Sequence, residues 1–368
     1  MTVSDILKRE NNNIDLLRLL AALLVAWSHI PALFGVSLIG PPMPVNVGLG
    51  GLGVAVFFFL SGMLVTNSLV TKKKPIAFAW SRFMRIYPAF LVVLLLSVFV
   101  IDPIFTTCSF GEYFSSSETW RFLGRNARLR IQYFLPGLWQ DRLDTSVNAS
   151  AWTIPLEVGC YFCVLLAFVS CRYLKLKPWM FIAVALVCSV LPHDWFIHLT
   201  GKGYSIIDHV DLFCFTAGAA MALYKEQVRI NKTLILALLA VCVMAWRCQN
   251  IISCLFPLTV SLTLLYATSV APLLKFKLKH DISYGLYLWH WPVYQVMFTF
   301  IGGINPYLFF VICLFVMVAI SYVSARLVEE PCLALGRRLG QRKTKMPDNG
   351  LLLLMLMVVA FLIAKFLF

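Results

Sequence analysis

Three ionisable side chains lie within the first long apolar run of the chain, residues 14–34: Asp15, Arg18 and His29. Ionisable groups are costly in lipid, so those retained inside an apolar span usually serve a function. Arg18 and His29 are eleven residues apart, and eleven helical steps of about 100° end only about 20° past three full turns. The two side chains therefore share one helix face, about 16 Å apart along the axis. One helix would carry an anion-binding guanidinium near one membrane surface and an imidazole near the other.

Two of these side chains also have plainer interpretations. Asp15 lies three residues before Arg18, a spacing at which the two charges can pair on a helix. His29 could be an interfacial residue that hydrogen-bonds to a carbonyl group. The first interpretation predicts an Asp15–Arg18 ion pair, and the second leaves His29 without a chemical role.

A pair of guanidinium groups lies at the start of another apolar run. Arg82 and Arg85 are three residues apart, so they share a helix face at the cytoplasmic mouth of the span 86–105. Paired guanidinium groups suit phosphate because each offers a fixed fork of donors. The alternative is ordinary contact with anionic lipid headgroups, and spacing alone does not choose between them.

A carboxylate and a second imidazole lie inside later apolar runs. Glu157 is a few residues into the run 151–170, and we expect it in the outer half of the membrane, at a depth similar to that of His29. There it could orient an imidazole or take a proton from a substrate hydroxyl, or it could form a structural ion pair. His290 lies mid-run among aromatic residues, where it serves either chemistry or packing alone.

The composition requires that these runs lie in a membrane. Of the 368 residues, 60% are apolar and only 13% are charged, about half the charged fraction of soluble domains. A soluble globule could not bury that much apolar surface, so we predict an all-α polytopic membrane protein. Its candidate spans are residues 14–34, 48–70, 86–105, 151–170, 178–192, 205–224, 232–247, 251–270, 282–301, 307–328 and 350–368.

The net charge of +14 follows from topology. With the N-terminus in the cytoplasm and alternating spans, most Lys and Arg residues fall in cytoplasmic connections, as the positive-inside rule requires. The long connection 106–150 is then the main outer loop. Nucleic acid is not needed to explain the charge, and the eleven cysteines mostly lie in apolar spans as small hydrophobes, so we expect no metal site.

The order and spacing of several motifs resemble the acyltransferase-3 family of integral membrane acyltransferases. The similarity covers roughly residues 14–340. The matching segments are Asp15-Leu16-Leu17-Arg18 followed by His29, Phe57-Phe58-Phe59-Leu60-Ser61-Gly62, Arg82-x-x-Arg85, Trp152-Thr153-Ile154-Pro155-Leu156-Glu157, Ser283-Tyr284-Gly285-Leu286-Tyr287-Leu288-Trp289-His290 and Glu330-Pro331.

The resemblance implies ten core helices, a cytoplasmic acyl-CoA donor, usually acetyl-CoA, and a carbohydrate or lipid-linked glycan acceptor across the bacterial inner membrane. It implies a membrane acyltransferase domain over residues 1–345, with an additional helix in 346–368. The esterase-like domain fused to some members is not evident, which leaves open a separate periplasmic partner. The implied roles are donor binding by Arg18, Arg82 and Arg85, catalysis by His29 and Glu157, and support from Asp15, Ser61, Trp152, Tyr284 and His290.

Two mechanisms and one different function remain as alternatives. We favour His29 as general base on the acceptor hydroxyl with direct acyl transfer, and an acyl-histidine intermediate is the second mechanism. A polytopic transporter or exporter of a glycan or lipid-linked precursor is the alternative function. Many transporters contain two similar halves, and we find no such internal symmetry in this sequence.

Overall fold

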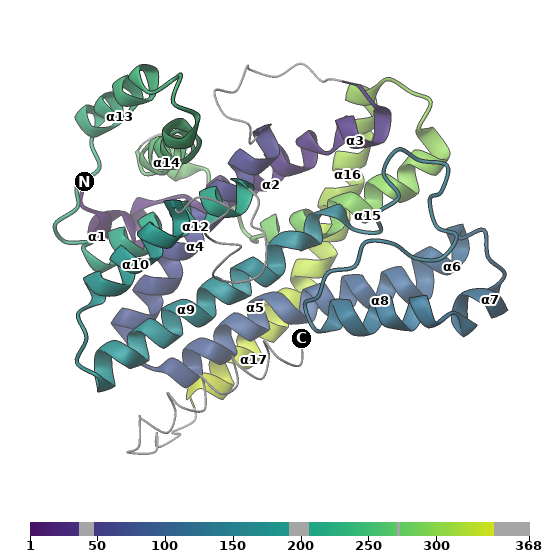
Figure 1. The fold of residues 1–368 in the computed structure, drawn as a ribbon, viewed down its shortest axis with the longest axis horizontal. Coiled ribbons are helices and arrows are strands. Elements are labelled where there is room, and N and C mark those ends of the chain that lie inside the picture. The colour runs from purple at the N-terminus through teal and green to yellow at the C-terminus, as the bar shows by residue number, and fades with distance from the viewer. Residues whose placement is uncertain (37–47, 191–205, 271–272, 342–368) are drawn as a thin grey trace.

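The computed structural model describes residues 1–36, 48–190, 206–270 and 273–341. Within these residues the regular structure is helical throughout, with a single isolated β-bridge between Thr2 and Arg229 and no strand (Figure 1). The predicted all-α class is therefore confirmed for the described part of the chain. The predicted eleventh span, residues 350–368, lies outside the described residues.

Six helical stretches are long and apolar enough to cross a membrane, which supports the prediction of a polytopic membrane protein. They are Ile14–Phe34, Gly48–Lys72, Pro75–Phe105, Ala149–Tyr173, Gln249–Thr268 and Pro306–Gly340. Three shorter apolar helices, Pro178–Ser189, His209–Leu223 and Lys232–Met244, occupy other predicted spans. The structure thus supports several spans without establishing the predicted number.

The named elements of these stretches are as follows. The N-terminal part contains α1 (Val3–Ile6), α2 (Ile14–Ser28), α3 (Ile30–Phe34), α4 (Gly48–Lys72) and α5 (Pro75–Leu96). The stretch Pro75–Phe105 ends with α6 (Asp102–Phe105), the connection 106–150 contains α7 (Phe110–Ser115) and α8 (Ser117–Ala127), and α9 (Thr153–Tyr173) follows it. The remainder comprises α10 (Pro178–Val190), α12 (Ile206–Leu223), α13 (Lys232–Met244), α14 (Gln249–Thr268), α15 (Ser283–Ile301), α16 (Pro306–Ser324) and α17 (Glu330–Gln341).

The helix α15 is central to the fold. Every residue from Ser283 to Gln295 is buried, so this helix is covered on all sides rather than along one stripe. It packs against α16, α2 and α5, and against the short 3₁₀ turn Ala149–Trp152. Its aromatic and polar residues consequently face protein and not lipid.

A close helix crossing joins α4 to α12, and two glycines permit it. A Cβ atom built on Gly62 would lie 2.0 Å from the carbonyl oxygen of Phe215, and one on Gly218 would lie 2.1 Å from that of Phe59. No side chain fits at either position, so the two backbones touch directly, as small residues allow between membrane helices. The crossing holds α4, which carries Ser61, against the rest of the bundle.

The third predicted span begins earlier than expected. The helix α5 starts at Pro75 and not at residue 86, because a proline at the first turn loses no hydrogen bond and is already set for a helical backbone. Arg82 and Arg85 therefore lie two turns or more inside a helix rather than at its mouth. Their guanidinium groups point into the protein interior, which changes the partners available to them.

Candidate active site

The side chain of His29 is positioned by a break between α2 and α3. Pro31 follows closely, and proline cannot continue the helical hydrogen-bond pattern. The backbone N–H of His29 accordingly bonds to Ala26 O at 3.2 Å instead of to Val25 O. The carbonyl of Val25 is thereby left for the imidazole of His29, whose Nδ1 lies 2.8 Å from it. The expected carbonyl contact exists, and it orients the ring rather than excluding a chemical role.

His290 reaches the same place from α15. It is fully buried, and its Nδ1 lies 2.8 Å from Tyr287 O. Its Nε2 lies 3.2 Å from Nδ1 of His29. Because a carbonyl oxygen only accepts, both Nδ1 atoms must be the protonated nitrogens of neutral rings. Nε2 of His290 is then an acceptor facing the Nδ1–H of His29, and Nε2 of His29 keeps a lone pair that can accept a proton.

The end of the connection 106–150 holds α15 in place beside this histidine pair. The Tyr287 hydroxyl donates to Ser150 O at 2.7 Å and lies 2.6 Å from Thr153 Oγ1. Farther out, the indole of Trp291 donates to Ser146 O at 2.8 Å. These bonds attach the segment 146–153 along one side of α15, so the loop and the helix that carries His290 form one unit.

Arg142 anchors the same loop. Its guanidinium donates to the backbone and side-chain oxygens of Gln295 and, at 2.5 Å, to Thr299 Oγ1. It also lies 4.0 Å above the ring of Trp139, a favourable cation–π geometry. Burial lowers the pKa of Arg142 to about 10, so the group remains charged at neutral pH.

Glu157 lies among side chains of α4 and α9. Its carboxylate accepts from Ser61 Oγ at 3.0 Å and from the Tyr161 hydroxyl. It lines a cavity of about 40 Å³ together with Arg18, and His29 contacts other residues. Of the two roles considered for Glu157, orienting an imidazole is not what these hydrogen bonds show, and a role toward a substrate hydroxyl stays a prediction. The N-terminal end of α9 is held to Tyr287, one turn before His290 on α15, and Glu157 lies about one turn farther along α9.

Arg18 and Arg85 share one carboxylate, that of Asp281. Arg18 donates to Asp281 Oδ2, and Arg85 donates to the same oxygen at 2.6 Å. Asp281 Oδ1 accepts from the backbone N–H of Ser283 at 3.1 Å and from its hydroxyl at 2.5 Å. Burial would raise the pKa of Asp281, but Arg18 and Arg85 hold it well below its usual range.

The predicted pairing of Asp15 with Arg18 is not what the structure shows. Among the ion pairs of the described residues, Arg18 bonds to Asp281 alone, while Asp15 faces a larger cavity. The spacing rule allowed the Asp15 pair, but Asp281 enters from the start of another helix and reaches Arg18 from the protein interior. There, less solvent screening makes the interaction stronger.

Arg82 and Arg85 lie in different surroundings. Arg85 pairs with Asp281 and lines the larger cavity. Arg82 lies 5.8 Å from the ring centre of Tyr161 and 5.9 Å from that of Phe78, and it donates to Ser81 Oγ at 3.1 Å. The two guanidinium groups, which the spacing placed on one helix face, therefore have different partners.

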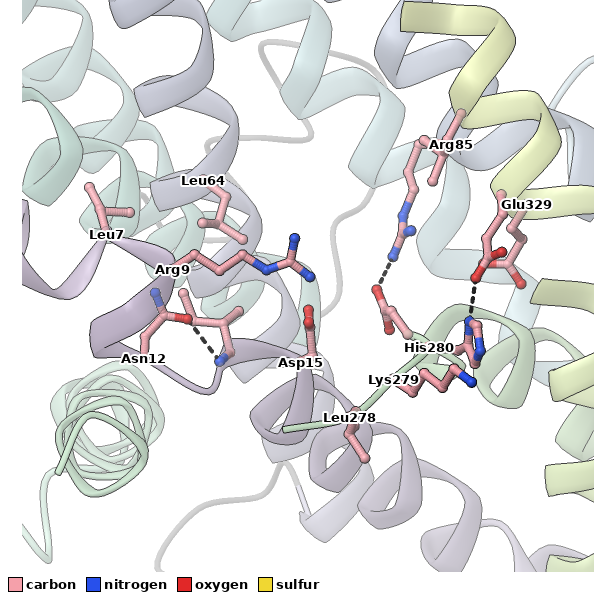
Figure 2. Close-up of a pocket in the computed structure, with 14 residues that line it drawn as sticks. Leu7, Arg9, Asn12, Asp15, Leu64, Arg85, Leu278, Lys279, His280 and Glu329 are labelled. Atoms are coloured by element: carbon pink, nitrogen blue, oxygen red, sulfur yellow. Dashed lines mark hydrogen bonds and ion pairs between the residues drawn. The ribbon is translucent and has the colours of Figure 1, made fainter. Parts of the chain in front are cut away.

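The larger cavity has a volume of about 460 Å³. It is bordered by the N-terminal segment, by residues 278–281 and by the junction of α16 with α17. Figure 2 shows Arg9, Arg85 and Lys279 around it, together with Glu329. Nearby, Nδ1 of His280 lies 2.7 Å from a carboxylate oxygen of Glu330.

The two aromatic residues predicted to support the site pack around these centres. The Tyr284 hydroxyl donates to Ile86 O at 2.9 Å, and its ring lies 5.9 Å from the Arg85 guanidinium. Trp152 is half-buried at the start of α9 and packs among apolar side chains of the bundle. Tyr284 and Trp152 therefore fix the positions of helices, and Tyr284 also lines the small cavity.

Sequence reasoning missed Asp281, Glu329 and Tyr161. Asp281 lies two residues before Ser283, where an acidic residue often accepts the first N–H groups of a helix, and that spacing was a usable signal. Tyr161 lies four residues after Glu157 on the same helix face, which was a second signal. Glu329 directly precedes the Glu330-Pro331 motif, and nothing in the sequence distinguishes the roles of the two glutamates.

A family model described as an acyltransferase domain, of the acyltransferase-3 type, matches residues 11–326. The chain is 29% identical over 338 residues to an O-acetyl transferase of Shigella phage Sf6, covering 87% of this chain and 96% of that protein. It is 24% identical over 369 residues to nodulation protein 10 of Rhizobium leguminosarum bv. viciae, covering 90% and 96%. No solved structure matches the chain.

The chain therefore belongs to the acyltransferase-3 family. It is a membrane protein and an O-acyltransferase. The resemblance inferred from the order of its motifs is confirmed.

Proposed function

We propose that this protein transfers an acetyl group from cytoplasmic acetyl-CoA to a hydroxyl of a carbohydrate on the outer side of the bacterial inner membrane. The observation that carries this proposal is the placement of Arg18 and His29 on one helix region. Arg18 belongs to the ion-pair cluster beside the larger cavity, and His29 presents a proton-accepting Nε2 about 16 Å farther along.

The larger cavity is the proposed site of the donor nucleotide. It is lined by three cationic side chains, Arg9, Lys279 and Arg85, and by four carboxylates, those of Asp15, Asp281, Glu329 and Glu330. The three cations are the groups that would bind the phosphates of CoA. Arg85 offers a fork of donors and is proposed to bind one phosphate directly. Arg82 lies beside Tyr161 and is proposed to act farther along the path, in positioning the acyl arm.

The thioester arm would then pass Arg18, Ser61 and Glu157 toward His29. The small cavity these three residues share lies between the nucleotide site and the histidine pair. An amide N–H of the arm would donate to the Glu157 carboxylate, a role that fits the position of Glu157 better than proton transfer from the acceptor. Asp15 and Trp152 would shape the two ends of this path.

The reaction step follows from the tautomer of His29. The acceptor hydroxyl donates its proton to Nε2 of His29 as its oxygen attacks the thioester carbonyl. The carbon–oxygen bond forms, the carbon–sulfur bond breaks, and the CoA thiolate leaves with the electron pair. The imidazolium then returns the proton to the thiolate, directly or through water. His290 would hold the ring so that Nε2 and not Nδ1 faces the hydroxyl.

The test is acetyl transfer by the purified protein in proteoliposomes. Radiolabelled acetyl-CoA is supplied on the cytoplasmic face and a lipid-linked or soluble glycan on the other. The proposal requires labelled glycan from the parent and almost none from His29→Ala or His29→Gln variants that remain in the membrane. Flux of unmodified glycan without label transfer would favour a transporter, and a label trapped on His29 would favour the acyl-histidine route.

A further inference from the structure

The carboxylate of Asp281 connects residues that line the two cavities. Arg85 and Asp281 line the larger cavity, while Arg18 lines the smaller one with Glu157. Asp281 Oδ2 bonds to both guanidinium groups. The three side chains come from α2, α5 and the start of α15, so this ion-pair cluster joins the lining of one cavity to the lining of the other. On the proposed function, a donor arm that passes from one cavity to the other runs past this cluster.

Asp281 has no capacity for a further strong partner. Its Oδ2 accepts from two guanidinium groups, and its Oδ1 accepts from the backbone N–H and the hydroxyl of Ser283. An arriving phosphate therefore competes with Asp281 for Arg85. If the guanidinium of Arg85 moved away from Asp281, it would need another carboxylate inside the protein, because an unpaired buried charge is strongly unfavourable.

Glu329 supplies such a carboxylate. It is 3% exposed and lines the larger cavity. Its Oε1 accepts a 3.3 Å hydrogen bond from Ser324 Oγ, while its buried Oε2 has no hydrogen-bond partner among the described residues. A buried carboxylate oxygen without a donor calls for an explanation. Glu329 lies within electrostatic range of Arg85, and Figure 2 shows both side chains at the same border of the cavity.

The local backbone fits a specialised role for Glu329. The residues Ala325–Glu329 form a π-helical turn between α16 and α17, and this turn packs against α5, which carries Arg85. Such turns are rare and are often found at functional sites. The side chain of Glu329 is thereby turned inward toward Gly285, where a Cβ atom would lie 3.1 Å from Glu329 Oε1.

We propose that Arg85 alternates between two carboxylates, Asp281 and Glu329, and that its transfer to Glu329 opens the passage between the two cavities. This inference rests on the proposed function, because the ligand that favours the transfer is a CoA phosphate. In the closed arrangement Arg85 bonds to Asp281. In the open arrangement a phosphate and Glu329 together bind Arg85, and Asp281 keeps Arg18.

The experiment measures access to the small cavity from the cytoplasmic side. Val54 lines that cavity and is 5% exposed, so Val54→Cys is the reporter. Inside-out vesicles are treated with an anionic, membrane-impermeant thiosulfonate, and mass spectrometry of the peptide containing position 54 separates its modification from that of the native cysteines. The ligand is 3′-phosphoadenosine 5′-diphosphate, which carries CoA-type phosphates but no arm to block the passage.

The ligand should raise the rate of modification of Cys at position 54 by about tenfold or more, the scale of one charge-assisted hydrogen bond. Asp281→Asn should raise the rate without ligand, because Arg85 then has only Glu329. Glu329→Gln should abolish the acceleration by ligand even at a nucleotide concentration that saturates the variant. Glu330→Gln is the matched control, since Glu330 already bonds to His280 and Arg326, and the acceleration should persist.

Two results would overturn the exchange. One is an equal acceleration by ligand in Glu329→Gln and in the parent. The other is a ligand-free rate in Asp281→Asn as slow as in the parent. Failure of the nucleotide to bind the parent would instead count against the donor site of the proposed function. In that case the ligand-free comparison of Asp281→Asn with the parent still decides whether the passage is closed by this ion pair.

Discussion

Nε2 of His290 lies 3.2 Å from Nδ1 of His29, and this contact joins α15 to the break between α2 and α3. Each ring also contacts a backbone carbonyl of its own helix, at Val25 and at Tyr287. The two carbonyls assign the proton of each ring to Nδ1. On the proposed function, we therefore expect His290 to act on His29 as a positioning residue, with Nε2 of His29 left for the substrate.

This relationship predicts how substitutions at position 290 rank. His290→Gln can keep an acceptor oxygen near the former Nε2, whereas His290→Leu removes it. We expect His290→Leu to lower kcat by about tenfold or more. General-base catalysis usually accelerates a reaction by roughly 10²–10⁴-fold, and the loss of the positioning residue should remove a part of that acceleration. His290→Gln should recover much of that loss. Steady-state rates at saturating acetyl-CoA are the measurement, and equal rates for both variants would contradict a hydrogen-bonding role.

Arg85 should be needed for donor binding in detergent. Arg85→Ala is expected to weaken CoA binding by about tenfold or more, the value of a charge-assisted hydrogen bond. Arg85→Lys should restore it only in part, because lysine lacks the planar fork. The affinity of the parent should fall with added salt. Arg172→Ala, at the far end of α9, is the control and should bind CoA as the parent does.

The pH dependence of stability should change when Asp281 is replaced. Since the folded protein holds the pKa of Asp281 below its usual range, the ionised carboxylate stabilises the fold above about pH 4, and this contribution is lost as the pH falls further. Asp281→Asn should lower the melting temperature at pH 7, because removal of one partner from a buried ion pair typically costs about 3–5 kcal/mol.

The gap in melting temperature between parent and Asp281→Asn should stay constant from about pH 8 to pH 5 and narrow below about pH 4. Other carboxylates titrate in both proteins, so the difference isolates Asp281. Thermal unfolding in detergent across this range is the measurement. A gap that widened toward acid pH would reverse the predicted sign.

The crossing of α4 with α12 predicts a large effect of a small substitution. A Cβ at position 62 would overlap the backbone of Phe215, so Gly62→Ala should force the helices apart and lower the yield of folded protein. Gly159→Ala places the same methyl group on α9 with no atom within 4 Å. We expect that variant to purify normally, and monodispersity after size-exclusion chromatography distinguishes the two.

The orientation is testable with single cysteines. If α4 and α5 are joined in the cytoplasm, Lys74→Cys should resist a membrane-impermeant thiol reagent in intact cells. Arg125→Cys, in α8 of the outer loop, should be labelled. The positive-inside distribution is the reason for both expectations. Labelling at position 74 in sealed cells would reverse the topology and with it the cytoplasmic donor site.

The sequence by itself was enough for the helical membrane class, the family and the placement of Arg18 and His29 along one helical stretch. Each of these follows from local regularities. Apolar runs of sufficient length must be helical in lipid because every backbone group has to be bonded internally. The eleven-residue spacing places Arg18 and His29 on one face because the helical repeat is regular. The family followed from several short motifs in a fixed order.

The partners of these residues were decided by the tertiary structure. Arg18 had an acidic neighbour three residues away, yet it pairs with Asp281, distant in sequence and brought close by the packing of α15 against α2. Glu157 was considered as a partner that could orient an imidazole, yet it bonds to Ser61 and Tyr161, because the contact of Thr153 with Tyr287 sets the position of α9 against α15. Spacing along one helix determines which side chains share a face, whereas their contacts depend on the relative position of helices, set by packing across the whole bundle.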